Sequence, residues 1–453
     1  MQKKEGNSQE SGVRTHTTFV FPFFFILFFM LSSAFFFPDA VFAEEYTFDI
    51  SETEKKPYHL GGYAEFRPIL FGLDKDASLY KLKFYNRDEG STLEEYNATL
   101  QLEGSLEKGI ARLFVRTNTD YKNSYRGVDQ KTIIYEGFLS LKPSSSLTMD
   151  MGKKTLKWGK GYAWNPVAFV DRPKDPDEPE QNLEGFIVVS ADYIKSFQGP
   201  LKTVSFTPVL VPVYNHVNDV FGEIDNLNFA AKLYFLYYDT DIDFIILTGG
   251  SKTTRYGVDF SRNITTNFEI HGEFAFINDF KKRFIDSDVS VFEKEYDAKS
   301  YLLGIRYLTE KETTYIFEYY RNGTGFTSGE MKDYFSFINK GYDSYISTGS
   351  DMLLKKAVTI TEGNYGRPNP MRDYLYLRVS QKEPFDILYF TPSFTWIFNI
   401  TDKSFSLSPE LLYTAITNLE LRLKSSIISG ERLSDYGEKQ NDYRIEFRAR
   451  YYF

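Results

Sequence analysis

The last twelve residues of the chain constrain its fold more than any other stretch. From Asp442 to Phe453 they read Asp-Tyr-Arg-Ile-Glu-Phe-Arg-Ala-Arg-Tyr-Tyr-Phe, so that apolar and charged side chains alternate almost without interruption. Because successive side chains of a strand point to opposite faces, one face carries Tyr, Ile, Phe and Ala and the other carries Arg and Glu. Such a strand needs an apolar environment on one side and water on the other.

This alternation is typical of a strand in an outer-membrane β-barrel, where one face meets lipid and the other a wet lumen. The aromatic end of the chain, with Phe447, Tyr451 and Phe453 on the apolar face, resembles the C-terminal signal of Gram-negative outer-membrane proteins. That resemblance implies recognition by the barrel assembly machinery and insertion among outer-membrane lipid and lipopolysaccharide. The alternative is an edge strand of a soluble β-sandwich.

The other end of the chain predicts export. Lys3, Lys4 and Arg14 precede an uncharged stretch rich in Phe, Leu and Ile over residues 19–37, and small residues follow up to Ala43. We therefore predict a secretory signal peptide over 1–43, a short periplasmic segment over 44–57 and a barrel over 58–453. An uncleaved anchor helix is the alternative, because the apolar stretch is long enough to span a bilayer.

The composition agrees with a barrel and argues against some classes of partner and cofactor. The chain has 34 Tyr and 43 Phe, which aromatic girdles at two lipid interfaces would use. Its net charge of -9 argues against nucleic acid as a partner. It has no Cys, so that Cys-ligated zinc, iron-sulfur and thioether-haem sites are excluded.

Alternating runs predict eighteen strands in an all-β, antiparallel, up-and-down transmembrane barrel. A strand pair missed in 72–93 or 322–372 would change the count, so sixteen and twenty remain neighbouring alternatives. The runs lie near 58–71, 94–105, 109–119, 132–142, 147–155, 185–195, 202–212, 227–238, 241–249, 254–262, 266–278, 299–309, 313–321, 373–381, 387–398, 404–415, 418–427 and 442–453.

The connections between these runs sort into two classes. Every second connection is short, as periplasmic turns should be, and the long ones all fall at the opposite, extracellular end. The predicted long outer loops are 72–93, 120–131, 156–184, 213–226, 279–298, 322–372 and 428–441. The middle of the 322–372 segment, Gly329 to Lys340, has apolar residues that could form a short helix. The 322–372 segment could also fold into the barrel and plug it, in addition to the loop 157–184 that is discussed below.

Strand parity predicts which side chains face the lumen. The interior is expected to carry charges of both signs, and these charges either line a wet pore or pair with one another across the wall. A metal site at His271 is disfavoured, because Glu269, His271 and Glu273 stand about 7 Å apart in successive steps along one strand. The predicted pore-lining residues are Arg112, Arg116, Glu103, Glu269, His271, Glu273, Arg422, Lys424, Arg444, Glu446 and Arg448.

The segment from Met151 to Pro166 resembles the strand-to-loop passage of porin-like outer-membrane proteins. The resemblance rests on its Gly-Lys, Trp-Gly and Asn-Pro pairs: Gly152, Lys153, Trp158, Gly159, Asn165 and Pro166. It implies a loop, 157–184, that folds inward and narrows the barrel; the alternative is a loop that caps the rim from outside.

We expect Trp158 and Trp164 to anchor this constriction loop. Its acidic run should then bring Asp171, Asp175 and Asp177, together with Arg172, toward a ladder formed by Arg112 and Arg116. Carboxylates at a constriction would favour cations or bind Ca²⁺, although such a run can also be a solvated surface.

These observations predict a channel for small hydrophilic solutes rather than an enzyme. No Gly-x-Ser-x-Gly, His-Glu-x-x-His or phosphate-binding Gly motif is present, and neither a cofactor nor a metal is expected. Three alternatives stay open: a sheath around a partner such as a multihaem cytochrome, a surface receptor, and a polymer-export or capsule-anchoring barrel. A homo-oligomer is compatible with all of them.

Overall fold

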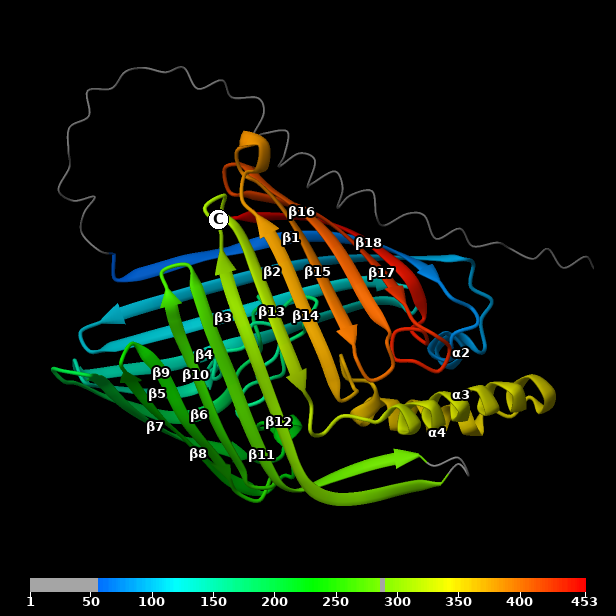
Figure 1. Cartoon of the computed structure of the whole chain (residues 1–453), viewed down its shortest axis with the longest axis horizontal. Coiled ribbons are helices and arrows are strands. Elements are labelled where there is room, and N and C mark those ends of the chain that lie inside the picture. The colour runs from blue at the N-terminus through cyan, green and yellow to red at the C-terminus, as the bar shows by residue number, and fades with distance from the viewer. Residues whose placement is uncertain (1–55, 286–289) are drawn as a thin grey trace, which may run out of the picture. The chain divides into compact units, whose positions relative to one another are not determined.

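Eighteen antiparallel strands form one sheet that closes on itself (Figure 1). Each strand pairs with the next along the chain, and the first strand, β1, pairs with the last, β18. The computed structural model describes residues 56–285 and 290–453, so the predicted signal peptide lies outside the described residues, as does nearly all of the 44–57 segment. The predicted closed barrel of eighteen strands is confirmed.

Every predicted strand has its counterpart in the barrel. The strands are β1 (Tyr58–Leu73), β2 (Thr92–Lys108), β3 (Ala111–Ser124), β4 (Gly127–Ser144), β5 (Leu147–Lys154), β6 (Phe186–Ser196), β7 (Leu201–Val213), β8 (Asn226–Tyr237), β9 (Thr240–Thr248), β10 (Arg255–Thr265), β11 (Phe268–Ile285), β12 (Val291–Leu308), β13 (Thr313–Arg321), β14 (Asp373–Gln381), β15 (Phe390–Asn399), β16 (Phe405–Ile416), β17 (Leu419–Ser429) and β18 (Asn441–Tyr452).

The two faces of the sheet differ as a membrane barrel requires. On β2, Leu100 and Leu102 are 41% and 46% exposed on the outside, whereas the alternate residues Asn97 and Gln101 are buried inside. The same alternation places Phe447 on the outer face of β18 and Glu446 on the inner face. An apolar exterior around a polar interior is the arrangement that lipid imposes, so the fold is a transmembrane barrel of the outer-membrane type.

Two predicted outer loops are wrong. Residues 120–131 and 279–298 belong mostly to the hairpins β3–β4 and β11–β12, whose strands run on past the predicted ends. In the first hairpin, Lys122 pairs with Asp129 across the strands, and both faces there are polar. In this hairpin the alternation that identifies a strand is lost because both faces are polar, so the sequence pattern placed the strand ends too early.

Helices occupy the end of the barrel that carries the long connections. α2 (Ser78–Phe84) packs against α3 (Ser328–Thr348), and α3 packs against α4 (Met352–Ile360) (Figure 1). Thr327 and Glu330 form a capping box at the start of α3. The helix predicted at Gly329 to Lys340 is confirmed and is longer than expected. Among the described residues, no helix is long and apolar enough to cross a membrane.

Part of the barrel interior is an apolar core. Val188, Val209, Val211 and Leu247, on the inner face of β6, β7 and β9, are fully buried. They pack in one cluster with residues of the connection between β5 and β6, such as Phe169. The parity argument, which expected charges throughout the lumen, missed this region because β7 is apolar on both faces.

The remaining short elements lie in connections. They are the 3₁₀ turns η2 (Asp219–Phe221) and η4 (Pro384–Asp386) and the π-helical turn η3 (Thr361–Tyr365).

Candidate functional site

The connection between β5 and β6, residues 155–185, contacts opposite parts of the barrel wall. Its first half bonds to Glu273 on β11 and Glu318 on β13, and its second half bonds to Arg422 on β17 and Arg448 on β18. β11 and β18 are far from β5 in opposite directions around the sheet. A single segment can reach both only by passing through the interior, and we call residues 155–185 the crossing segment.

Glu273 holds the first half of the crossing segment. Its Oε1 accepts hydrogen bonds from the backbone N–H groups of Lys160 and Gly161, each at 2.6 Å, and from Asn165 Nδ2 at 3.1 Å. Its Oε2 accepts from the N–H of Val167 at 3.2 Å. A carboxylate that accepts several N–H groups is bound in the same way as an anion in a backbone nest. Glu273 therefore fixes residues 160–167 against β11, and we call it a clamp.

A second carboxylate clamps the neighbouring turn. Glu318 accepts from the N–H of Ala163 at 3.0 Å and also from the N–H of Tyr162. His271 of β11 contacts Glu318 and Glu269. Its Nε2 lies 2.9 Å from Glu318 Oε1, and its Nδ1 lies 3.5 Å from Glu269 Oε1. His271 and Glu273 therefore face the interior but are covered by the crossing segment instead of lining open water.

Gly159 explains the Trp-Gly pair in the sequence. Its φ of +94° is a left-handed conformation, and a β-carbon there would lie 2.7 Å from Asn165 Nδ2 and 2.8 Å from Glu273 Oε1. A side chain would therefore be strained and would also push the chain off its clamp. The adjacent Lys160 reaches the wall, with Nζ 2.9 Å from Asp243.

Two tryptophans pack the crossing segment against apolar parts of the interior. Trp164 stacks on Tyr320 with ring centroids 5.1 Å apart and belongs to the apolar cluster that includes Met331 of α3 and Leu354 of α4. Trp158 belongs to the separate cluster of β6, β7 and β9. The segment is thus joined to the helices as well as to the wall.

The acidic tip of the segment meets a basic wall. Glu178 lies 3.0 Å from Arg422, 3.2 Å from Arg448 and 3.4 Å from Lys424. Burial by itself would raise the pKa of the Glu178 carboxyl, but Lys424, Arg448 and Arg422 lower it to about 2. Glu178 is therefore ionised and tightly held.

The predicted aspartates have different neighbours from those expected. Asp171 turns back on its own segment and accepts from the N–H groups of Leu156 at 2.7 Å and Trp158 at 3.0 Å. Burial raises its pKa above the ordinary value, while these backbone donors oppose the rise. Asp177 lies 3.9 Å from Arg444 of β18, and Asp175 is exposed.

The expected arginine ladder does not face these aspartates. Arg116 pairs with Glu103 at 3.0 Å and Glu136 at 2.7 Å, and Arg112 lies 3.5 Å from Glu107. Both arginines are paired across neighbouring strands of the wall. The cations that contact the crossing segment are instead Arg422 and Lys424 of β17 and Arg448 of β18. Arg448 also lies 3.0 Å from Glu446 of the same strand.

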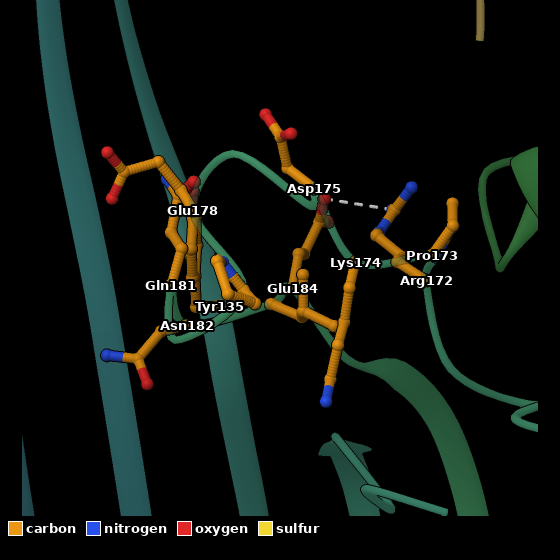
Figure 2. Close-up of a pocket in the computed structure, with 11 residues that line it drawn as sticks. Tyr135, Arg172, Pro173, Lys174, Asp175, Glu178, Gln181, Asn182 and Glu184 are labelled. Atoms are coloured by element: carbon orange, nitrogen blue, oxygen red, sulfur yellow. Dashed lines mark ion pairs between the residues drawn. The ribbon is translucent and has the colours of Figure 1, made fainter. Parts of the chain in front are cut away.

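A cavity of about 410 Å³ lies between the second half of the crossing segment and β4. Glu178, Gln181 and Asn182 stand at one side of it, and Arg172 stands at the other, 2.8 Å from Glu184 (Figure 2). Most of its lining residues are polar or charged, and both signs of charge are present. The lining consists of Tyr135, Arg172, Pro173, Lys174, Asp175, Glu178, Pro179, Gln181, Asn182, Leu183 and Glu184.

Two side chains of the cavity form hydrogen bonds with residues outside its lining. Lys174 donates to the carbonyl oxygen of Gly161 at 2.8 Å, and Asn182 donates to Gln101 of β2 at 3.4 Å. Burial lowers the pKa of Lys174, against the influence of Glu318 and Glu273. Within the described part of the chain, no set of three His, Asp or Glu is arranged to hold a metal ion.

Sequence reasoning missed two of the residues that hold the crossing segment, Glu318 and Glu178. Glu318 was not singled out, although it lies between Ile316 and Tyr320 on the same face of β13, where a lone acid is costly without hydrogen-bond donors. Glu178 was treated only as one member of an acidic run. The predicted assembly-signal residues lie where strand parity places them: Phe447, Tyr451 and Phe453 are exposed on the outer face.

Comparison with solved structures finds matches of low similarity. OccK5 (OpdH) of Pseudomonas aeruginosa matches with a TM-score of 0.49 and 11% identity over 87% of this chain and 98% of that chain. OprD of the same organism matches at 0.49 and 9%, covering 87% and 94%. A Rhodopseudomonas blastica porin matches at 0.42 and 10%, covering 87% and 100%. No protein-family model and no curated sequence matches this chain.

Proposed function

We propose that this barrel is a passive, mildly selective channel for small hydrophilic solutes, with the crossing segment as its constriction. The observation that carries the proposal is the crossing segment itself, which bonds to β11 and β13 at one end and to β17 and β18 at the other. Beside it lies a polar cavity of about 410 Å³. A cavity lined mostly by polar and charged residues can admit hydrophilic molecules of limited size.

The lining of the cavity favours small neutral or cationic solutes. It holds three carboxylates, Asp175, Glu178 and Glu184, and two cations, Arg172 and Lys174. Glu184 is shared by Lys153 at 2.5 Å and Arg172 at 2.8 Å, and Glu178 is bound to the basic wall. Exposed Asp175 is the carboxylate with most freedom to meet a solute.

The sheath alternative has less support. A barrel that encloses another folded protein needs an open interior, whereas here the crossing segment and two apolar clusters occupy it. The filled interior weighs less against the receptor and polymer-export alternatives. The helices at the outer end could serve as a binding surface as well as a cover for the channel.

The absence of Cys from the sequence allows a clean test. Purified protein in a planar bilayer should conduct ions, and Gln181→Cys should lose current when a charged thiol reagent modifies the cavity. Ile346→Cys, on an exposed face of α3, is the matched control and should keep its current. A parent protein that conducts no ions would refute the channel, and a current that is insensitive to modification at residue 181 would place the path elsewhere.

A further inference from the structure

Three buried carboxyl groups lie side by side on neighbouring strands of the barrel wall. The strand register places Asp259 of β10 opposite Asp243 of β9 on one side and opposite Glu273 of β11 on the other. Asp243, Asp259 and Glu273 are 1%, 0% and 4% exposed. Because neighbouring strands lie about 4.8 Å apart, the central Asp259 has a second acid close by on each side.

These three carboxyl groups differ in the hydrogen-bond donors available to them. Glu273 accepts the N–H groups of the crossing segment, and Asp243 Oδ2 lies 2.9 Å from Lys160 Nζ. Among the described residues, Asp259 is the only acid whose two carboxyl oxygens are both buried and accept no hydrogen bond. Lys160 Nζ is 3.9 Å from Asp259 Oδ1, which is beyond hydrogen-bond distance. An ionised Asp259 would therefore lose its hydration without gaining a donor, which is costly.

The charges around Asp243 and Asp259 do not remove this cost. The other titratable groups that surround the two aspartates are Lys232 and Tyr234 of β8, Asp241 of β9, Glu273 of β11 and Lys160 of the crossing segment. Lys160 lies closer to Asp243 than to Asp259, and Lys232 Nζ is 3.8 Å from Asp243 Oδ1. Two carboxylates on adjacent strands repel one another, and such a pair avoids the repulsion by keeping one proton.

We infer that Asp243 and Asp259 bind one proton between them at neutral pH, where the barrel wall meets the crossing segment. A proton on Asp259 turns one of its oxygens into an O–H donor. Asp243 Oδ1, which is also buried without a hydrogen-bond partner among the described residues, is the acceptor on the adjacent strand. One proton thus satisfies an oxygen of each aspartate and removes one negative charge from the row. A proton fits this site better than a metal ion, because no set of three His, Asp or Glu in the described residues is arranged to hold a metal.

The bound proton should help to hold the crossing segment against the wall. While it is bound, Lys160 contacts an ionised Asp243, and the clamp residue Glu273 has a neutral neighbour in Asp259. Loss of the proton at alkaline pH would leave three negative charges in one buried row. Their repulsion should weaken the packing of the first half of the crossing segment on β9, β10 and β11.

Infrared spectroscopy of the detergent-solubilised barrel tests the proton directly. A protonated carboxyl group has a C=O stretching band that is separate from the bands of carboxylates and amides. Near neutral pH the parent should show such a band, and Asp259→Asn should lose the equivalent of about one carboxyl group. Asp243→Asn should shift the band, because the O–H of Asp259 then meets an amide. Glu410→Gln is the matched control and should keep the band, because Glu410 is a buried acid that is already paired with Arg422 and Arg378.

Protease resistance of the crossing segment provides a second readout. Cleavage within 155–185 should accelerate in the parent at the alkaline pH at which the band disappears. Asp259→Asn is neutral at this position at every pH and should show no such acceleration. Equal acceleration in the two proteins would overturn the link between the proton and the crossing segment.

A parent without a band that depends on Asp259 would overturn the inference, because both aspartates would then be ionised. If such a parent also lost protease resistance when tetramethylammonium replaced sodium in the buffer, the site would be assigned to a sodium ion instead. The proposed channel is tested separately by conductance, so either result would leave that proposal standing.

Discussion

The N–H of Gly62 donates to the carbonyl oxygen of Phe453 at 3.0 Å, and the N–H of Phe453 donates to the carbonyl oxygen of Gly62 at 3.1 Å. This reciprocal pair continues the ladder between β1 and β18 and seals the barrel. The Phe453 side chain is 56% exposed on the outer face. One residue therefore completes the backbone closure and offers an aromatic side chain to the surroundings.

The exposed aromatic at the seam should matter for assembly. Phe453→Asp should reduce the amount of folded barrel in the outer membrane while export continues, because a charge replaces the apolar group on the lipid face. The measurement is heat-dependent mobility in gels of outer-membrane fractions. Tyr452→Asp, whose parent hydroxyl bonds to Glu420 and Arg450 beside the polar face, is the control. Equal yields of the two variants would contradict the assignment.

A positive charge should destabilise the barrel to different extents at two neighbouring residues of β2. Leu100→Arg should destabilise the folded barrel in vesicles by roughly 2–4 kcal/mol, because the guanidinium would face lipid. Gln101→Arg places that group on the inner face, next to Glu103 along the strand, and should cost much less. Urea unfolding followed by tryptophan fluorescence measures both. A larger cost at 101 than at 100 would reverse the two faces.

The clamp at Glu273 should keep the crossing segment in place. Glu273→Gln removes the charge that accepts the N–H groups of Lys160, Gly161 and Val167, and hydrogen bonds to charged groups contribute about 1.5–3 kcal/mol each. We expect faster proteolysis within 155–185 and a noisier current. Glu420→Gln, at a wall residue away from the segment, serves as control. Identical protease resistance in all three proteins would exclude a clamp.

The tip of the crossing segment should be released by acid. The pKa of Glu178 falls from its ordinary value of 4.5 to about 2, so its stabilising contribution is complete above about pH 4.5 and is lost as the pH falls toward 2. Single-channel current should therefore become larger or more variable over this window. Glu178→Gln should lack this transition, whereas Glu180→Gln, whose parent bonds to the Tyr162 hydroxyl, should retain it. A transition that persists in Glu178→Gln would assign it to other groups.

Ion preference should depend on the two aspartates of the tip, exposed Asp175 and half-buried Asp177. The double variant Asp175→Asn and Asp177→Asn should reduce the preference for cations, most clearly at low salt, where screening is weakest. Reversal potentials across a potassium chloride gradient give the comparison. Asp171→Asn is the informative control, because Asp171 bonds to Leu156 and Trp158 within its own segment. A larger effect at 171 than at 175 and 177 would argue against the proposed path.

The alternation of side chains by itself determined the barrel. A strand that must present one face to lipid and the other to water has a period of two, so the amino-acid sequence alone is enough to locate eighteen such runs and their short turns. The same logic separated Leu100 from Gln101 and Phe447 from Glu446. It failed only where both faces meet the same environment, as in the outer parts of β3 and β4 or along β7.

Only the tertiary structure decided what fills the barrel. The path of residues 155–185 depends on Glu273 and Glu318, which lie more than a hundred positions away in the chain, and on the position of β17 and β18 opposite Glu178. Local sequence carries no record of such distances. The pattern around Trp158 and Gly159 indicated a special turn, but the choice of Arg422, Lys424 and Arg448 over Arg112 and Arg116 as partners came from closure of the sheet, which brings distant strands to face one another.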